Sequence, residues 1–137
     1  MDIYEEIVMM AITRGKNLFV CPQVNLNNWS CPDFIGLDIK IPKIVVIEIS
    51  SAINIDDLIK KVNDRENQWY KEIRKDIKNN EFIKNLDIET HIYIRGEIKG
   101  KAELKINEPR KDVFVYKLED YLKLWVPIHW LSLKNNG

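Results

Sequence analysis

Residues 44–49, Ile-Val-Val-Ile-Glu-Ile, constrain the fold of this 137-residue chain more than any other stretch. The run is apolar, rich in β-branched side chains and too short for an ordinary helix, which predicts a strand buried on both faces. Glu48 lies inside this run. Because a buried carboxylate is costly unless it is paired, hydrogen-bonded or bound to a metal, Glu48 requires a partner.

Asp33 is the candidate partner of Glu48. It follows Pro32 at the start of a second expected strand, residues 34–39, and a hairpin at residues 41–43 would place the two strands side by side. Neighbouring strands lie about 5 Å apart, so the two carboxylates could share one divalent cation.

The residues Pro32-Asp33 and Glu48-Ile49-Ser50 together resemble the motif of the PD-(D/E)XK nuclease superfamily, the fold of many restriction enzymes, archaeal Holliday junction resolvases and repair nucleases. The resemblance implies that Asp33 and Glu48 bind Mg²⁺ or Mn²⁺, helped by the Ile49 carbonyl. In that family a lysine two residues after the glutamate helps to activate the attacking water, whereas this chain has Ser50 there. A serine can hold a water by hydrogen bonding but brings no charge.

A first helix is expected from Asp2 to about Thr13, because Asp2 and Glu5 have the spacing of a capping box and Gly15 follows as a stop. Glu6 lies on the margin of its apolar stripe. The resemblance implies that a glutamate from this helix completes the acidic cluster, and Glu6 is the residue that fits. A solvated helix glutamate is the alternative interpretation.

The longest expected helix begins near Asn54 or Asp56 and extends to about residue 78. Relatives in the superfamily sometimes supply the motif lysine from the following helix, and Lys61 is the candidate because Lys60 points away from the apolar stripe. Lys61 could therefore take the catalytic role that Ser50 cannot.

Glu66 falls inside the same stripe, and other polar residues border it. Arg65 and Gln68 could contact nucleic acid, and Gln68 resembles the helix glutamine that some relatives place near the substrate, although position 72 is Glu where the fuller signature has Tyr. Arg65 and Glu66 could equally pair with residues at the edge of the core.

Residues 87–95 alternate between apolar and polar side chains, which predicts a strand with His91 on a solvated face. Residues 96–111 have two glycines and a basic bias, so they are expected to form a mobile connection. Lys99 and Lys101 in this segment could touch phosphates, or the segment is a plain surface loop. Further expected elements are strands at residues 17–26 and 113–116 and a helix at residues 118–125.

The expected order is helix, strand, strand, strand, long helix, strand, strand, helix (αβββαββα). This order predicts an α/β protein with a restriction-endonuclease-like core, in which helices flank a mixed central β-sheet, in one nuclease-like domain, residues 1–137.

Composition limits the possible partners and location. Lys+Arg and Asp+Glu balance at 21 each, so any nucleic-acid contact must come from a local basic face. Cys21 and Cys31 fit neither a metal pair nor a disulfide scaffold. The N-terminus is acidic where a secretory leader would be basic. No apolar run approaches the length of a membrane helix. A cytoplasmic protein without membrane contact is therefore expected.

The sequence favours a metal-dependent DNA endonuclease, with a homodimer possible because resolvase-like cleavage would need two-fold symmetry. One alternative is a catalytically inactive protein with the nuclease fold that binds nucleic acid or a protein partner. Another is a structural subunit in which Glu48 forms a buried salt bridge with Arg65 or Lys61.

Overall fold

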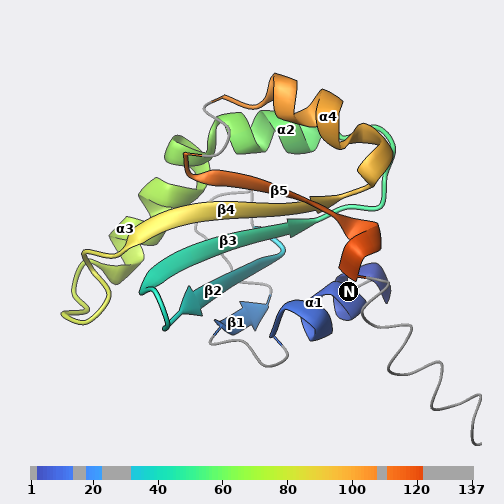
Figure 1. The fold of residues 1–137 in the computed structure, drawn as a ribbon. Helices are drawn as coiled ribbons and strands as arrows, with labels where there is room; N and C mark the ends of the chain where they lie inside the picture. The colour runs from blue at the N-terminus through green and yellow to red at the C-terminus, as the bar shows by residue number, and fades with distance from the viewer. Residues whose placement is uncertain (1–2, 14–17, 23–31, 108–110, 122–137) are drawn as a thin grey trace, which may run out of the picture.

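The computed structural model of this chain describes residues 3–13, 18–22, 32–107 and 111–121. These residues form a five-stranded mixed sheet flanked by helices, which confirms the predicted α/β class (Figure 1). None of the helices in the described part combines the length and apolar character that crossing a membrane requires. In chain order the elements are α1 (Ile3–Thr13), β1 (Leu18–Pro22), β2 (Phe34–Asp38), β3 (Lys43–Ile49), α2 (Asp56–Asn63), the π-helix η1 (Glu66–Tyr70), α3 (Lys71–Ile77), β4 (Asp87–Ile94), α4 (Gly96–Lys105) and β5 (Val113–Lys117).

The strands lie in the sheet in the order of the sequence, β1-β2-β3-β4-β5. The first three strands form an antiparallel meander, and β3, β4 and β5 run parallel to one another. Asp38 closes the β2–β3 turn, because its Oδ1 accepts the N–H groups of Lys40 (3.0 Å) and Ile41 (3.3 Å). Parallel neighbours require crossover connections, which α2, η1 and α3 provide before β4 and α4 provides before β5.

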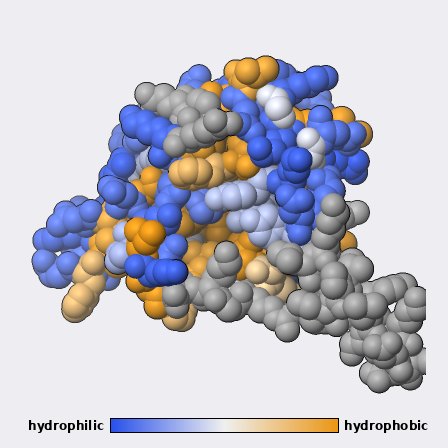
Figure 2. Space-filling view, in the orientation of Figure 1, coloured by the Kyte–Doolittle hydropathy of each residue, from blue (hydrophilic) through white to orange (hydrophobic). Residues whose placement is uncertain are grey.

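Side chains of β3 alternate between two covered faces of the sheet, and six of its seven residues are buried. Ile44 and Val46 pack against the α2–η1–α3 layer, whereas Val45 and Ile47 pack against α1. The expectation of a strand buried on both faces is confirmed. Figure 2 shows hydrophilic side chains over the helices at the top of the view and hydrophobic ones gathered over the sheet.

The segment at residues 96–111 was expected to be a mobile connection, and this is wrong, because Gly96–Lys105 forms α4. Ile98, Ala102 and Ile106 recur every four residues, which places them on one side of a helix. Ala102 and Ile106 are buried against the rest of the core. The order of elements is therefore helix, strand, strand, strand, helix, strand, helix, strand. The helix expected at residues 118–125 begins at residue 118 and is described only as far as residue 121.

The long helix is not continuous, because the π-helical turn η1 separates α2 from α3. A π-turn contains more residues than an α-turn, so the angular positions beyond it shift relative to an ideal α-helix. Glu66, expected inside the apolar stripe, is exposed, whereas Tyr70 is buried and its hydroxyl lies 2.8 Å from Oγ1 of Thr90. The placement of Glu66 from an ideal helical wheel was therefore wrong.

His91 does not lie on a solvated face, as had been expected. Its side chain is 16% exposed and lies edge-on to the rings of Phe114 and Tyr116 on β5. Burial lowers the pKa of His91, and a hydrogen bond to Glu89 (2.9 Å) partly offsets this. The expectation failed because Phe114 and Tyr116 of β5 lie beside His91 and Tyr93 of β4 and cover that side of the strand. At the other edge of the sheet, the strand expected at residues 17–26 is described over Leu18–Pro22, and its expected remainder lies outside the described residues.

Candidate metal centre

Asp33 and Glu48 lie beside each other at the carboxyl end of β3. The β2–β3 register pairs Phe34 with Ile47, so the next residue pair outward is Asp33 and Glu48. Oδ2 of Asp33 accepts the N–H of Ile49 at 2.9 Å, which fixes the aspartate against the end of β3. The hairpin thus brings together the two carboxyl groups that the sequence paired.

Glu48 is only 8% exposed, because it points to the face that α2 and α3 cover. Burial, followed by the charge of Asp33 and a hydrogen bond to it, raises the pKa of Glu48 to about 9, and the nearby charge of Lys61 partly opposes this rise. At neutral pH the Glu48 carboxyl therefore keeps its proton when no cation is present. Burial and a neighbouring like charge both favour the protonated form of a carboxyl group.

The donor set suits a small divalent cation. Mg²⁺ binds through one or two carboxylates and retains several waters, and its ligands are hard oxygen atoms. A cation between Asp33 and Glu48 would replace the proton of Glu48 and offset the negative charge of the two carboxylates. We therefore consider that the pair, with the main-chain carbonyl of Ile49 adjacent, fits Mg²⁺ or Mn²⁺.

Glu6 does not join this pair. It is exposed on α1, the helix that packs on the opposite face of the sheet from Glu48. Among the described residues, no group of three or more His, Cys, Asp or Glu side chains lies close enough together to hold a metal ion. The remaining ligands of a cation would therefore be waters or substrate oxygen atoms, as is common for Mg²⁺.

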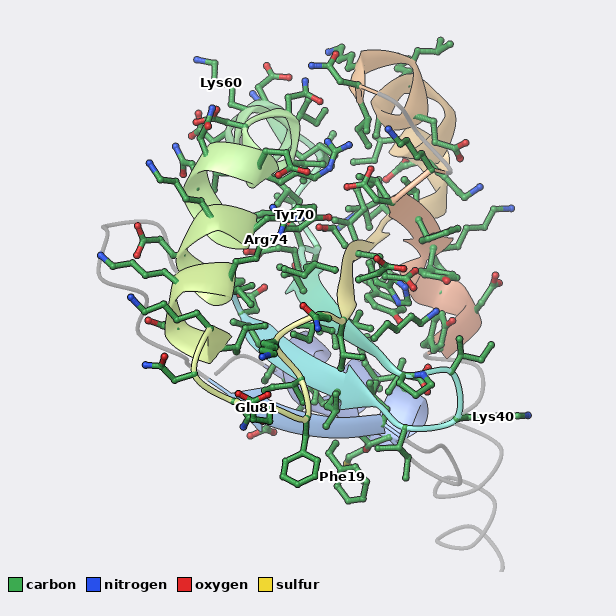
Figure 3. All side chains as sticks on the ribbon, turned by 90° about the vertical axis from the view of Figure 1, so that its left-hand side faces the viewer. Phe19, Lys40, Lys60, Tyr70, Arg74 and Glu81 are labelled. Carbon is green, nitrogen blue, oxygen red and sulfur yellow. The ribbon has the colours of Figure 1, made fainter. Side chains whose placement is uncertain are left out.

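Lys61 and Ser50 flank the carboxyl pair from two different elements. Lys61 is exposed on α2, and its charge reaches Glu48. Its neighbour Lys60 lies on the outer side of the helix layer, directed to solvent (Figure 3). The N–H of Ser50 donates to the carbonyl of Tyr93 at 3.0 Å, which extends the hydrogen bonding between β3 and β4 by one residue. The Oγ of Ser50 accepts the N–H of Ala52 at 3.2 Å. The serine hydroxyl keeps its own hydrogen to donate.

Arg65 is not at this site. Its Nε and Nη2 donate to the two carboxylate oxygens of Asp112, each at 2.7 Å, and further bonds reach the carbonyls of Val62 (2.8 Å) and Asn107 (3.1 Å). The guanidinium that was expected to contact nucleic acid is therefore engaged by Asp112, and the pairing with residues at the core edge is confirmed. A salt bridge between Arg65 and Glu48 is also excluded, because Asp112 occupies the guanidinium.

The other expected nucleic-acid contacts lie on ordered helices. Gln68 is in η1, where its Oε1 is buried and has no hydrogen-bond partner among the described residues. Lys99 and Lys101 are on α4, and Nζ of Lys99 pairs with Oε1 of Glu103 at 2.7 Å. Lys101 is exposed.

A cavity of about 480 Å³ lies at the opposite end of β3, where β3 and β4 begin. Figure 3 shows Tyr70 and Arg74 on the helix that borders this end of the sheet. Charged side chains around the cavity pair with one another, including Arg74 with Glu66 (2.9 Å) and Lys43 with Glu89. Neither Asp33 nor Glu48 lines this cavity, so it is separate from the carboxyl pair.

Sequence reasoning missed Arg95, which follows β4 directly. Its Nε donates to the carbonyl of Ser51 at 2.5 Å, so the guanidinium lies against the loop that leaves β3 after Glu48. The carboxyl ends of parallel strands meet at one edge of a sheet, where ligands of α/β proteins usually bind. If β3 and β4 had been predicted to be parallel, the end of β4 would have been expected beside the end of β3, and Arg95 would have been a candidate site residue.

No family model, curated protein or solved structure matches this chain. The interpretation of the site therefore depends on its residues and their geometry.

Proposed function

We propose that this chain is a metal-dependent DNA endonuclease of the PD-(D/E)XK type, a cytoplasmic enzyme that cleaves phosphodiester bonds with Mg²⁺ or Mn²⁺. The observation that carries the proposal is the pairing of Asp33 with Glu48 on one face of the sheet, where the carboxyl group of Glu48 is buried. The antiparallel meander followed by a helical crossover to a parallel strand supports it, because the resemblance implies a mixed sheet flanked by helices.

The chain's own residues have separable roles in this chemistry. A bound Mg²⁺ or Mn²⁺ would supply Lewis acidity, which lowers the pKa of a bound water and neutralises charge on the phosphate. Asp33 and Glu48 would hold the cation, and the Ile49 carbonyl could supply a third oxygen donor. Lys61 places a positive charge near the reacting phosphate, and Ser50 donates a hydrogen bond to the attacking water.

A second candidate is a protein that has the nuclease fold and binds nucleic acid or a protein partner without cleaving it. Ser50 at the position of the motif lysine favours this candidate, because the nearest replacement, Lys61, is an exposed side chain on a different element. This candidate predicts no phosphodiester hydrolysis even at high Mn²⁺ concentration.

The test combines a calorimetric titration with Mn²⁺ and a plasmid-nicking assay on the same samples. Asp33→Asn and Glu48→Gln should each lose Mn²⁺ binding and lower nicking at least about 100-fold, since even outer-shell partners of a metal contribute about 10–100-fold. Asp38→Asn, at the other end of β2, and Glu72→Gln, a glutamate that is also 8% exposed, are the matched controls. Both controls should bind Mn²⁺ and nick DNA as the wild type does.

Three outcomes separate the candidates. Binding and nicking that are lost only in the two site variants support the endonuclease. Mn²⁺ binding without nicking on any DNA tested favours the non-cleaving protein, and undiminished nicking by Asp33→Asn contradicts the proposed site. A two-fold dimer, which cleavage of both strands would favour, can be checked on the same samples by light scattering.

A further inference from the structure

Arg95 lies at the same edge of the sheet as the carboxyl pair. The parallel β3–β4 register pairs Glu48 with Ile92 and Ile49 with Tyr93, and the N–H of Ser50 continues it by donating to the carbonyl of Tyr93 at 3.0 Å. Arg95 is thus three residues beyond the level of Glu48. Because a strand rises about 3.3 Å per residue, the displacement along the strand is about 10 Å.

The bond from Nε of Arg95 to the carbonyl of Ser51 fixes the orientation of the guanidinium plane. The side chain is 41% exposed, and its Nη1 makes only a long contact, 3.4 Å, with a carboxylate oxygen of the exposed Glu97. Exposed pairs of this kind contribute about 1 kcal/mol or less, so a stronger anion can replace Glu97. The outward nitrogens of Arg95 are therefore available to an incoming ligand.

The chemistry of that ligand follows from the guanidinium and its position. Arginine presents a planar fork of donors that matches the oxygens of a phosphate. The displacement of about 10 Å along the strand places Arg95 outside the metal-binding position itself. A displacement of about 10 Å corresponds to about three nucleotide steps of a duplex strand, which carries one phosphate about every 3.4 Å along its axis.

We propose that Arg95 binds a backbone phosphate of the DNA strand that Asp33 and Glu48 hold for cleavage, a role that rests on the proposed nuclease function. The bond to Ser51 holds the guanidinium beside the loop that follows the metal-binding strand. Arg95 therefore sets the register of the substrate at the site and does not take part in the bond-breaking step.

The experiment measures binding of a fluorescein-labelled duplex by anisotropy, without divalent metal, across a series of salt concentrations. Arg95→Gln should weaken binding about 5- to 10-fold near 0.1 M salt and lower the slope of log affinity against log salt by about 0.9, as expected for one lost phosphate contact. Arg95→Lys keeps the charge but not the fork, so it should retain the slope with an intermediate affinity. Arg74→Gln is the matched control, because Arg74 is 53% exposed and pairs with the exposed Glu66.

Each alternative result overturns the proposal about Arg95. Equal weakening by Arg95→Gln and Arg74→Gln would show only a general effect of surface charge, and an unchanged slope in Arg95→Gln would show no phosphate contact. If the wild type binds no duplex, Arg95 has no such role, and a Mn²⁺ titration of the same sample then shows whether the metal site stands by itself.

Arg95→Gln should bind Mn²⁺ as the wild type does, so loss of metal binding in this variant would assign Arg95 to the metal site instead. If Arg95→Gln does not fold, the affinity of Arg95→Lys decides, and wild-type affinity in that variant would contradict the need for a fork.

Discussion

Glu48 sets the energetics of the candidate site, because its carboxyl group is buried beside the carboxyl group of Asp33. Burial and the neighbouring charge both disfavour the ionised form. The same arrangement that prepares the pair for a cation makes it costly when no cation is present. The protonation of one residue should therefore be visible in the stability of the metal-free protein.

The first prediction concerns this cost. The pKa of Glu48 is about 9 in the folded chain and has an ordinary value of 4.5, so between these pH values the folded protein binds more protons than the unfolded chain. The free energy of unfolding should therefore fall as pH rises through this window, by at most about 1.4 kcal/mol per pH unit from this group. Urea unfolding in EDTA between pH 5 and about 9 measures this slope.

Glu48→Gln removes the titrating group and should flatten the slope. Glu97→Gln, on the exposed surface at the same end of the sheet, is the control for the substitution itself. A slope in Glu48→Gln as steep as that of the wild type would assign the pH dependence to other residues.

At the scale of elements, the sequence predicted best where a short local pattern decides the structure. The short β-branched apolar run at residues 44–49 and the hairpin before it were enough to place Asp33 opposite Glu48. The segment at residues 96–111 was wrongly predicted to be a mobile connection, because its glycines and charges suggested a loop and only three apolar residues, spaced four apart, indicated a helix. The choice of Asp112 as the partner of Arg65 could not be predicted, since the two residues are 47 positions apart in the sequence.

The second prediction belongs to the Arg65–Asp112 pair, which ties the helix layer to the residues before β5. Removing one partner of a buried, hydrogen-bonded ion pair costs about 3 kcal/mol or more, so Arg65→Met should lower the free energy of unfolding by about this amount. Arg74→Met is the control, because Arg74 and Glu66 are both exposed, and it should cost about 1 kcal/mol or less. Chemical denaturation measures both variants.

A double-mutant cycle with Arg65→Met and Asp112→Asn should give a coupling of at least about 1 kcal/mol, because the two side chains share two short hydrogen bonds. Additive effects would mean that the carbonyls of Val62 and Asn107, and not Asp112, account for the stabilising role of Arg65.

At the scale of the whole molecule, residues from three separate segments meet at one edge of the sheet, where β3 and β4 end. The β2–β3 hairpin brings Asp33, the crossover into α2 brings Lys61, and the end of β4 brings Arg95. The Arg65–Asp112 pair and the 480 Å³ cavity lie at the opposite edge, where β3 and β4 begin. Binding at the first edge should therefore stabilise the fold, because residues of both the sheet and the α2 layer contribute to that edge.

The third prediction tests this link between the site and the fold. A ligand that binds only the folded state adds RT ln(1 + [L]/Kd) to stability, which is about 2.7 kcal/mol at 100 times the Kd, so saturating Mn²⁺ should raise the free energy of unfolding of the wild type. Because Mn²⁺ must displace the proton from Glu48, the gain at a fixed Mn²⁺ concentration should be larger at pH 8 than at pH 6. Asp33→Asn should show no gain, whereas Asp38→Asn should gain as the wild type does. An equal gain in Asp33→Asn would mean that Mn²⁺ binds elsewhere, and the carboxyl pair would then contribute to the fold alone.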